Sequence, residues 1–391
     1  MLISGAGIAG PTLAYWLARH GFSPTVVERS GAVRSSGSPV DVRGPALEVA
    51  LRMNIMPRIR EAGTDVAYLS FVDARGKRVG RINMRALRQA AGSQEVELPR
   101  GDLASILYEA SRSAAEFLFN NAIAGISQDE HGVDVTFENG PPRRFDLVIG
   151  ADGLHSAVRR LAFGPESDFV DHMGLYIATL HLDSAERGNE VVVYNTPGTA
   201  ISIHPSTGHA LVAFLFHSPA EPGFDHRDIA RHKRILEARF AHGSWRTREL
   251  IDRVRAADDL YFDSVSQVHL DQWWRGRVVL LGDAASSLSL FGEGSTLAMA
   301  GAFTLAEELA ANPGDHRTAF RNYEARHRIL VAPKQRGSWQ AAALLVPRTR
   351  LGISARNLAT RLWPLGAAAA WLLVSPHDRR HIDLHAQQHR Q

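Results

Sequence analysis

The feature that most constrains the fold is a glycine-rich segment close to the N-terminus, Gly5-Ala6-Gly7-Ile8-Ala9-Gly10. A short apolar strand precedes it, and a helix is expected from about Ala9 to His20, because Gly21 can close it in the left-handed conformation. The next strand, Pro24–Glu28, ends in an acid at the spacing where such units bind an adenosine ribose. This order of elements predicts a Rossmann-like unit that binds a dinucleotide, with its pyrophosphate at the helix N-terminus. The motif alone does not separate NAD from FAD.

Composition argues against several other classes of protein. The 44 basic and 41 acidic residues leave a formal charge of +3, and the arginines are dispersed, so a nucleic-acid partner is not expected. The chain has no cysteine, which removes disulfides, thiolate metal sites and a cysteine nucleophile and is typical of a cytoplasmic protein. Its longest apolar run, Leu365–Val374, is shorter than the roughly 20 residues of a membrane span. The 18 histidines follow no metal-ligand spacing, so no metal site is expected.

The pattern of strands and helices changes along the 391 residues, a length that suffices for two or three domains. Both ends alternate strands with helices, as at the buried strand Arg277–Leu281 and the helix Ser295–Ala311. Residues 172–217 are rich in strands, and Leu69–Asp73 with Arg78–Met84 have a hairpin pattern. The sequence therefore predicts an α/β fold in which an antiparallel-sheet domain interrupts the first domain.

The expected domain boundaries follow from these changes. The first domain takes residues 1–68, 99–165 and 264–330, the inserted domain takes 69–98 and 166–263, and a C-terminal helical segment takes 331–391. Two local details are also predicted. Residues Ala46–Ala62 have the spacing of one helix, and Asp102 is a candidate N-cap for a helix over Leu103–Ala115.

A second motif spans Asp146–Arg159. Asp152 and Gly153 follow the carboxyl end of an apolar strand, and Ser156 and Arg159 lie in the next helix. Taken alone, this segment can equally be a capped junction between a strand and a helix.

A third motif spans Arg277–Gly294. A buried strand ends at Gly282-Asp283, and a loop leads through Gly292 and Gly294 to a helix that begins near Ser295. Asp283 is placed to bind sugar hydroxyls, and the helix N-terminus would stabilise a nearby anion. The alternative is an ordinary strand exit.

In this order and spacing, the three motifs resemble the class A flavoprotein monooxygenases. These are FAD-dependent aromatic hydroxylases, which include p-hydroxybenzoate hydroxylase and the tetracycline-inactivating monooxygenases. The resemblance covers roughly residues 1–330 and extends to Val40–Ala46 and Leu98–Leu103. It implies a Rossmann-like domain of the glutathione-reductase type that holds FAD, and an inserted domain that holds the substrate. The FAD is expected to be noncovalent, because the chain has no cysteine for a thioether link.

The resemblance also implies the residues that bind FAD. Glu28 would hold the adenosine ribose, and Arg43 would lie near the isoalloxazine. Arg100 and Asp283 would contact the ribityl-pyrophosphate region, and Asp152 would belong to a motif shared by FAD and NADPH binding. The full implied set is Gly5, Gly7, Ala9, Gly10, Glu28, Arg29, Arg43, Arg100, Asp152, Asp283, Gly292, Gly294 and Ser295.

The activity implied by the resemblance is monooxygenation. NADH or NADPH would reduce FAD, O₂ would add at flavin C4a, and the hydroperoxide would transfer one oxygen to an apolar aromatic or polyketide-like small molecule. Because the chain has one nucleotide fingerprint, NAD(P)H is expected to visit a surface groove transiently. The chain departs from the family where Ser286 replaces a frequent histidine and Ser287–Leu290 lacks proline. A halogenase, a dehydrogenase or a flavin-binding protein without oxygen chemistry stays an alternative.

Candidate substrate contacts come from the strand-rich middle of the chain. Alternation in Ala210–His217 puts Phe214 and Phe216 on one face, which is predicted to cover the flavin, although such side chains are more often core. Tyr194 and His204 are further candidates, with structural roles as the alternative. No catalytic base is assigned. The protein is expected to be a monomer or a homodimer.

Overall fold

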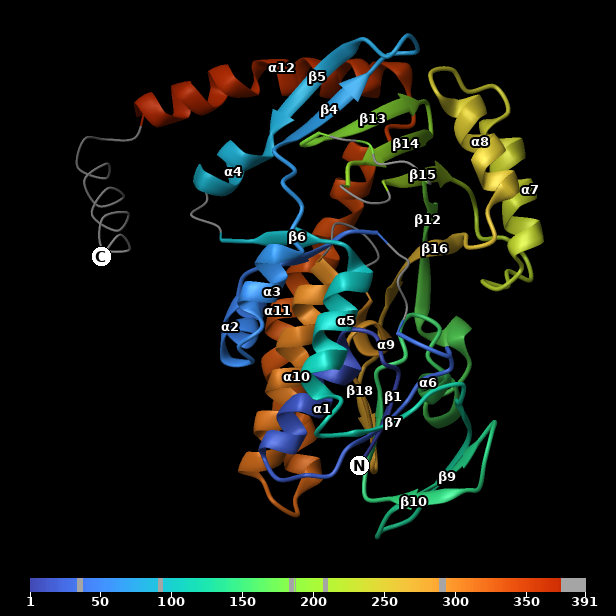
Figure 1. Cartoon of the computed structure of the whole chain (residues 1–391), viewed down its shortest axis with the longest axis vertical. Helices are drawn as coiled ribbons and strands as arrows, with labels where there is room; N and C mark the ends of the chain where they lie inside the picture. Colours follow the sequence, from blue (N-terminus) through green and yellow to red (C-terminus); the bar gives the residue numbers. More distant parts are fainter. Residues whose placement is uncertain are drawn as a thin grey trace.

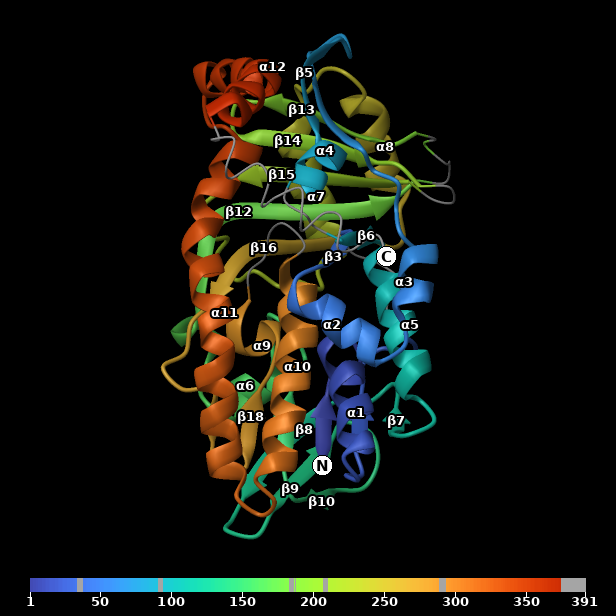
Figure 2. The ribbon, with the colours of Figure 1, turned by 90° about the vertical axis from the view of Figure 1, so that its left-hand side faces the viewer.

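The structure is a computed structural model that describes residues 1–373 except 34–37, 91–93, 183–185, 187, 207–209 and 288–292. Two principal β-sheets follow one another along the long axis of the molecule, with helices beside both (Figure 1). The long helix α11 (His316–Leu345) runs past both sheets, and α12 (Arg350–Leu373) lies at the far end (Figure 2). The described residues contain no helix long and apolar enough to span a bilayer, and no cluster of three acidic or histidine side chains that could hold a metal ion.

The first sheet has six strands, and every neighbouring pair except β17–β18 is parallel. In spatial order they are β17 (Trp274–Arg275), β18 (Val278–Leu280), β11 (Val148–Gly150), β1 (Leu2–Ser4), β2 (Thr25–Val27) and β7 (Glu116–Leu118). The four central strands are buried along their whole length, because helices α1 (Ala9–Arg19), α5 (Arg100–Ser111) and α10 (Glu293–Ala311) cover one face (Figure 1). Parallel strands covered in this way read as continuous apolar runs.

The second sheet has seven strands, all antiparallel to their neighbours except the pair β13–β4. In spatial order they are β16 (Tyr261–Val268), β12 (Val170–His181), β15 (Leu211–His217), β14 (Thr199–His204), β13 (Glu190–Thr196), β4 (Tyr68–Val72) and β5 (Arg78–Asn83). Helices α7 (Ile229–Phe240) and α8 (Thr247–Ala256) cover one face. The prediction of an α/β fold interrupted by a mainly antiparallel sheet and followed by helices is confirmed.

Two smaller ladders complete the sheets. Strands β8 (Ile123–Gln128), β9 (Val133–Phe137) and β10 (Arg143–Phe145) form a three-stranded antiparallel sheet at the end of the molecule nearest the N-terminus (Figure 1). Strands β3 (Val40–Val42) and β6 (Val96–Leu98) pair between the two principal sheets (Figure 2). Short helices are α4 (Met84–Ala90), α6 (Ala157–Ala162), α9 (Asp283–Ser286) and the 3-10 turn η1 (Glu166–Asp168), besides two more that are described next.

Two local predictions are wrong. The expected single helix over 46–62 is two helices, α2 (Pro45–Arg52) and α3 (Met56–Glu61), because Asn54 between them has a φ of 57°. Asparagine is one of the few residues that adopts this left-handed conformation readily. Asp102 is not an N-cap, since α5 begins at Arg100 after Pro99 and Asp102 lies inside the first turn.

Candidate active site

Four adjacent strands of the first sheet end at the same edge, and the predicted motifs follow them there. The register pairs Ser4 of β1 with Val27 of β2 on one side and with Gly150 of β11 on the other, and Gly150 pairs with Leu280 of β18. The chain leaves β1 toward β2, whereas β11 and β18 lie on the opposite side. Ligands of doubly wound sheets bind at such a switch point, outside the carboxyl ends of the strands.

The glycine loop after β1 fits an anionic group. Gly5 has a φ of 104°, and a Cβ there would lie 2.5 Å from the carbonyl oxygen of Ala151, so the first and second motifs touch. A Cβ on Gly7 would meet nothing within 4 Å, which leaves open space beside the loop. In the described part of the chain no side chain caps the N-terminus of α1, and its first turn holds no acid. Its N–H groups are therefore available to a phosphate.

Glu28 closes this loop from the end of β2. Its two carboxylate oxygens accept backbone N–H groups from Ala6 and from Ser30, each at 2.8 Å. The carboxylate is therefore fixed beside the glycine turn, at the position predicted for an adenosine ribose. Arg29 follows it and is exposed.

Asp152 is held by its own motif. Its carboxylate accepts the Ser156 hydroxyl at 2.5 Å, the Val158 N–H at 3.1 Å and the Ser4 hydroxyl at 3.3 Å. Burial raises the pKa of Asp152 above its ordinary value. The side chain thus fixes the turn between β11 and α6, and a role toward a cofactor stays a prediction.

The three motifs also contact one another. The buried guanidinium of Arg159, from the second motif, donates to the carbonyl oxygen of Ala284 in the third at 3.0 Å. Gly282 has a φ of 63°, and a Cβ there would lie 3.2 Å from the Cβ of Ala9 in the first motif. The sequence placed Arg159 in its motif but gave no sign of the contact with Ala284, which lies 125 residues away.

Asp283 lies where several elements meet. It starts α9, and a Cβ on Gly294 at the start of α10 would lie 3.4 Å from its Oδ1. Burial raises the pKa of Asp283, the nearby Arg100 at the start of α5 lowers it, and Asp263 of β16 raises it. Arg100 and Asp283 are therefore neighbours, as the resemblance implies. Gly292 lies outside the described residues.

Arg43 belongs to an ionic cluster rather than standing alone. Its guanidinium pairs with Glu293 at the start of α10, and Lys334 of α11 pairs with the same carboxylate. Asp41 and Glu95 also lie within 4 Å of Arg43, at 3.9 and 3.8 Å. The positive charge of Arg43 is thus shared among three carboxylates.

The first turn of α10 is fixed against β3. The hydroxyls of Ser295 and Thr296 donate to the carbonyl oxygen of Asp41 at 2.6 and 3.0 Å, and the Arg43 N–H donates to the Thr296 hydroxyl at 3.3 Å. Gly294 and Ser295 therefore stand at a fixed position opposite the ends of β1 and β18.

Comparison with known proteins agrees with this geometry. A family model described as an FAD binding domain matches residues 1–328. A flavin-dependent monooxygenase of Legionella longbeachae is 35% identical over 365 residues, which cover 88% of this chain and 90% of the relative. This chain belongs to the class A flavin-dependent monooxygenases.

Other relatives extend over similar lengths. An uncharacterized protein of Mycobacterium tuberculosis is 39% identical to this chain over 350 residues, covering 87% of this chain and 91% of the relative. The crystal structure of the tetracycline destructase Tet(51) superposes with a TM-score of 0.81 at 32% identity, covering 92% of this chain and 94% of that one. The fold and the family predicted from the motifs are both confirmed.

The predicted substrate contacts of the monooxygenase need a correction. Phe214 and Phe216 are 0% and 1% exposed, and their rings lie 5.1 and 6.2 Å from the ring of Phe240 in α7. Tyr194 lies on the same face, 5.7 Å from Trp245. This face is covered by α7 and α8, so the prediction that it covers the flavin is wrong.

The opposite face, here called the inner face, forms part of a core with Ala342 and Val346 at the end of α11, and its edge strand β16 packs against α9 of the third motif. Cross-strand pairing puts Tyr261, Thr179, Ala213 and Ser202 in one row on it. His204 shares this face, because its Nε2 lies 3.1 Å from the Ser202 hydroxyl.

Two polar atoms of the inner face lack a partner. Within the described residues, Thr179 Oγ1 and His204 Nδ1 are buried without a hydrogen bond. Burial lowers the pKa of His204 to about 4, which makes the ring neutral at physiological pH. His204 thus remains a candidate contact, whereas Thr179 and Ser202 are candidates that sequence alternation could not single out.

Proposed function

We propose that this protein is an NAD(P)H-dependent monooxygenase that holds FAD noncovalently and inserts one oxygen atom of O₂ into an apolar aromatic or polyketide-like small molecule. The observation that carries the proposal is the convergence of three motifs at the carboxyl ends of β1, β11 and β18, next to the edge strand β16 of the second sheet. A dehydrogenase needs the first motif alone. A longer cofactor that extends from the glycine loop toward α10 would account for the other two motifs lying at the same edge.

The residues at the site suit the parts of FAD. The glycine loop, the N-terminus of α1 and Glu28 would hold the adenosine diphosphate half, because they offer free N–H groups and a fixed carboxylate. Asp283 and Arg100 would hold the ribityl-pyrophosphate region. The N–H groups of the first turn of α10, at Gly294 and Ser295, would stabilise negative charge on the ring. When bound and reduced, FAD supplies the electrons and the activation of O₂.

The substrate class is proposed from the inner face and from the relatives. The inner face combines apolar Ile177, Ala213 and Leu215 with the polar groups of Thr179, Ser202 and His204. Such a surface suits a ring system that carries oxygen substituents. A tetracycline destructase and a monooxygenase of Cercospora beticola, which is 32% identical, are among the related proteins.

The domain assignment is part of the proposal. FAD would be bound by residues 1–68, 99–165 and 264–330, and the substrate by residues 69–98 and 166–263. The second set supplies all seven strands of the second sheet except Tyr68, the first residue of β4, and the last part of β16, so the boundary at residue 263 crosses β16. Asp263 therefore stands where the two parts meet.

The test is direct. The purified protein should show the absorbance of bound flavin, release FAD intact on denaturation, and oxidise NADH or NADPH faster when a substrate is present. A product heavier by one oxygen atom, labelled from ¹⁸O₂, completes the proof. A halogenated product, or hydride transfer without O₂ uptake, would replace the proposal with one of its rivals. A colourless protein that rejects added FAD would end it.

A further inference from the structure

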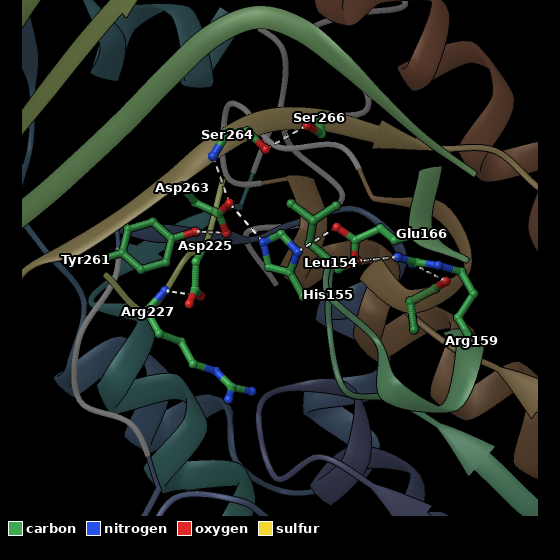
Figure 3. A network of polar contacts seen from close by, with 11 residues as sticks. Leu154, His155, Arg159, Glu166, Asp225, Arg227, Tyr261, Asp263, Ser264 and Ser266 are labelled. Atoms are coloured by element: carbon green, nitrogen blue, oxygen red, sulfur yellow. Dashed lines mark hydrogen bonds and ion pairs between the residues drawn. The ribbon is translucent and has the colours of Figure 1, made fainter. Parts of the chain in front are cut away.

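His155 of the second motif lies between two carboxylates that come from different parts of the chain. Its Nδ1 is 2.9 Å from an oxygen of Glu166 in η1, and its Nε2 is 3.0 Å from Oδ1 of Asp263 in β16 (Figure 3). The ring of His226 stacks on it with centroids 4.2 Å apart and planes 4° apart. The Asp263 side chain is 9% exposed and that of His155 is 19% exposed, so the pair is largely shielded from water.

The geometry favours a charged His155. An ionised carboxylate can only accept, so with both carboxylates ionised each ring nitrogen carries a hydrogen. Burial alone would lower the pKa of His155, but the hydrogen bonds to Asp263 and Glu166 outweigh it and raise the pKa to about 9. His226 stays neutral beneath it, because burial and the charge of His155 lower the pKa of His226 to about 4.

Each of the two carboxylates that contact His155 also lies close to further residues of the site. Asp263 lies beside Tyr261 at 3.4 Å and close enough to Asp283 to raise its pKa. Glu166 lies 3.5 Å from Arg159, which itself holds the carbonyl oxygen of Ala284 next to Asp283. The network thus approaches Asp283 from the second sheet, through Asp263, and from the second motif, through Arg159 and Ala284.

We propose that His155 is a positioning residue: its imidazolium holds Asp263 of the second sheet against the turn of the second motif and compensates the charge of Asp263 beside Asp283. In that role it joins the two principal sheets at the cofactor site. The part concerning the cofactor rests on the proposed function, whereas the part joining the sheets does not.

Removal of the imidazolium should therefore matter in two ways. Asp263 would become a shielded carboxylate without a cationic partner, which is strongly destabilising in buried pairs. Its charge would also act uncompensated on Asp283 and on the diphosphate of a bound dinucleotide. The charged and titratable groups in contact with His155 are Glu166, Asp263 and the stacked ring of His226. Arg159 lies beside Glu166, and Asp225 and Arg227 act on His226.

The experiment compares His155→Leu, Asp263→Asn and the double variant with the native protein. Thermal unfolding of the FAD-free protein and FAD affinity by flavin fluorescence are measured for each. His155→Leu should lower the melting temperature by several degrees and weaken FAD by about tenfold or more, as an unpaired shielded charge does. Asp263→Asn should be milder, and in the double variant the loss caused by His155→Leu should shrink, because no unpaired carboxylate remains. Additive effects would overturn the proposal.

His20 provides the matched control, because it also pairs with a carboxylate, Glu307 at 2.9 Å, but far from Asp283. His20→Leu should leave FAD affinity unchanged. If His155→Leu fails to fold, His155→Gln carries the same comparison, since an amide keeps one donor but no charge.

The pH profile separates positioning by charge from simple packing. Because the folded pKa of His155 lies above its ordinary value of 6.5, its stabilisation is complete below pH 6.5, declines as the pH rises, and is lost above about pH 9. The melting temperature of the FAD-free native protein should therefore fall toward that of His155→Leu over this range. Parallel profiles would overturn the proposal. The profile needs no flavin, so it stands apart from a failure of the proposed function.

Discussion

Glu28 is a single side chain that is hydrogen-bonded to the glycine loop and placed beside it. Its carboxylate accepts the Ala6 and Ser30 N–H groups and is the proposed partner of the adenosine ribose. Glu28→Ala should weaken FAD by about 1–3 kcal/mol, since two backbone donors and the ribose lose a charged acceptor. Flavin fluorescence titration measures the change, with Glu48→Ala, an exposed partner of Arg52, as the control. Full flavin retention at nanomolar protein would contradict the assigned role.

Asp283 and Ser286 lie in the same short helix but should respond differently. Asp283 faces Arg100 and Gly294, whereas the Ser286 hydroxyl lies within α9, 3.5 Å from the Gly282 carbonyl oxygen. Asp283→Ala should weaken FAD by about 1–3 kcal/mol through loss of a shielded acceptor, and Ser286→Ala should have a much smaller effect. Flavin fluorescence reports affinity, and circular dichroism checks that both variants fold. The reverse order would mean that the third motif has been assigned in the wrong register.

At the same scale, sequence patterns are informative where the chemistry is local. The glycine loop and Glu28 directly follow buried strands, and Asp283 lies three residues after one, so each position can be read from the sequence. The contacts of Arg159 with Ala284 and of His155 with Asp263 join residues 125 and 108 positions apart, and no local pattern encodes them. The sequence therefore predicts which motifs lie at the strand ends, whereas the contacts that join these motifs to one another are not predictable from it.

Among the elements, β15 explains the wrong assignment of Phe214 and Phe216. Residues Leu211–Phe216 are all buried, since α7 and α8 cover one face of the strand and the rest of the protein covers the other. A strand buried on both sides has no alternation of polar and apolar residues, so its parity cannot be read from sequence. The presence of the strand was predictable from the sequence, but which of its two faces lies under α7 and α8 was not.

Phe214→Ala tests the corrected facing of β15. The change removes a ring packed on Phe240 and should destabilise the protein by about 3–5 kcal/mol, through lost burial and the cavity left behind. FAD affinity and the substrate KM should stay close to native, because the ring points away from the inner face. Chemical denaturation and steady-state kinetics check the two halves. A raised KM together with native stability would show instead that Phe214 points toward the substrate, as first predicted.

The ladder β3–β6 carries a pH dependence of its own. Asp41 and Glu97 are directly opposite each other, and burial, with the charge of Asp41, raises the pKa of Glu97 to about 7. The folded state therefore binds this proton more tightly than the unfolded chain, and stability falls as the pH rises from 4.5 to 7. Glu97→Gln should reduce this slope to the part due to Asp41, whose pKa burial raises to about 6, and add roughly 1–3 kcal/mol at pH 8. Urea unfolding at pH 5 and pH 8 measures it, and an unchanged slope would contradict the assignment.

For the whole molecule, α11 joins the two principal sheets. Phe320, Tyr323 and Val331 belong to the core of the first sheet, whereas Ala342, near the other end of the helix, belongs to the core beneath the second. We expect the sheets to unfold together, because either one loses part of its core when this helix leaves. Thermal unfolding followed by tryptophan fluorescence and by far-ultraviolet circular dichroism should give coincident transitions. Two separated transitions would show that α11 does not couple them.

The parallel pair β4–β13 has a consequence for synthesis on the ribosome. Phe71 in β4 pairs with Val193 in β13, about 120 residues later in the chain. The hairpin of β4 and β5 therefore emerges long before its partner, with the hydrogen-bonding edge of β4 open to other chains. Slow, non-local pairing of this kind exposes a nascent protein to aggregation. Production of this chain should accordingly depend on chaperone capacity and temperature more than its folded stability alone would suggest. A fragment that begins after residue 83 lacks β4 and β5 and should not form the complete second sheet.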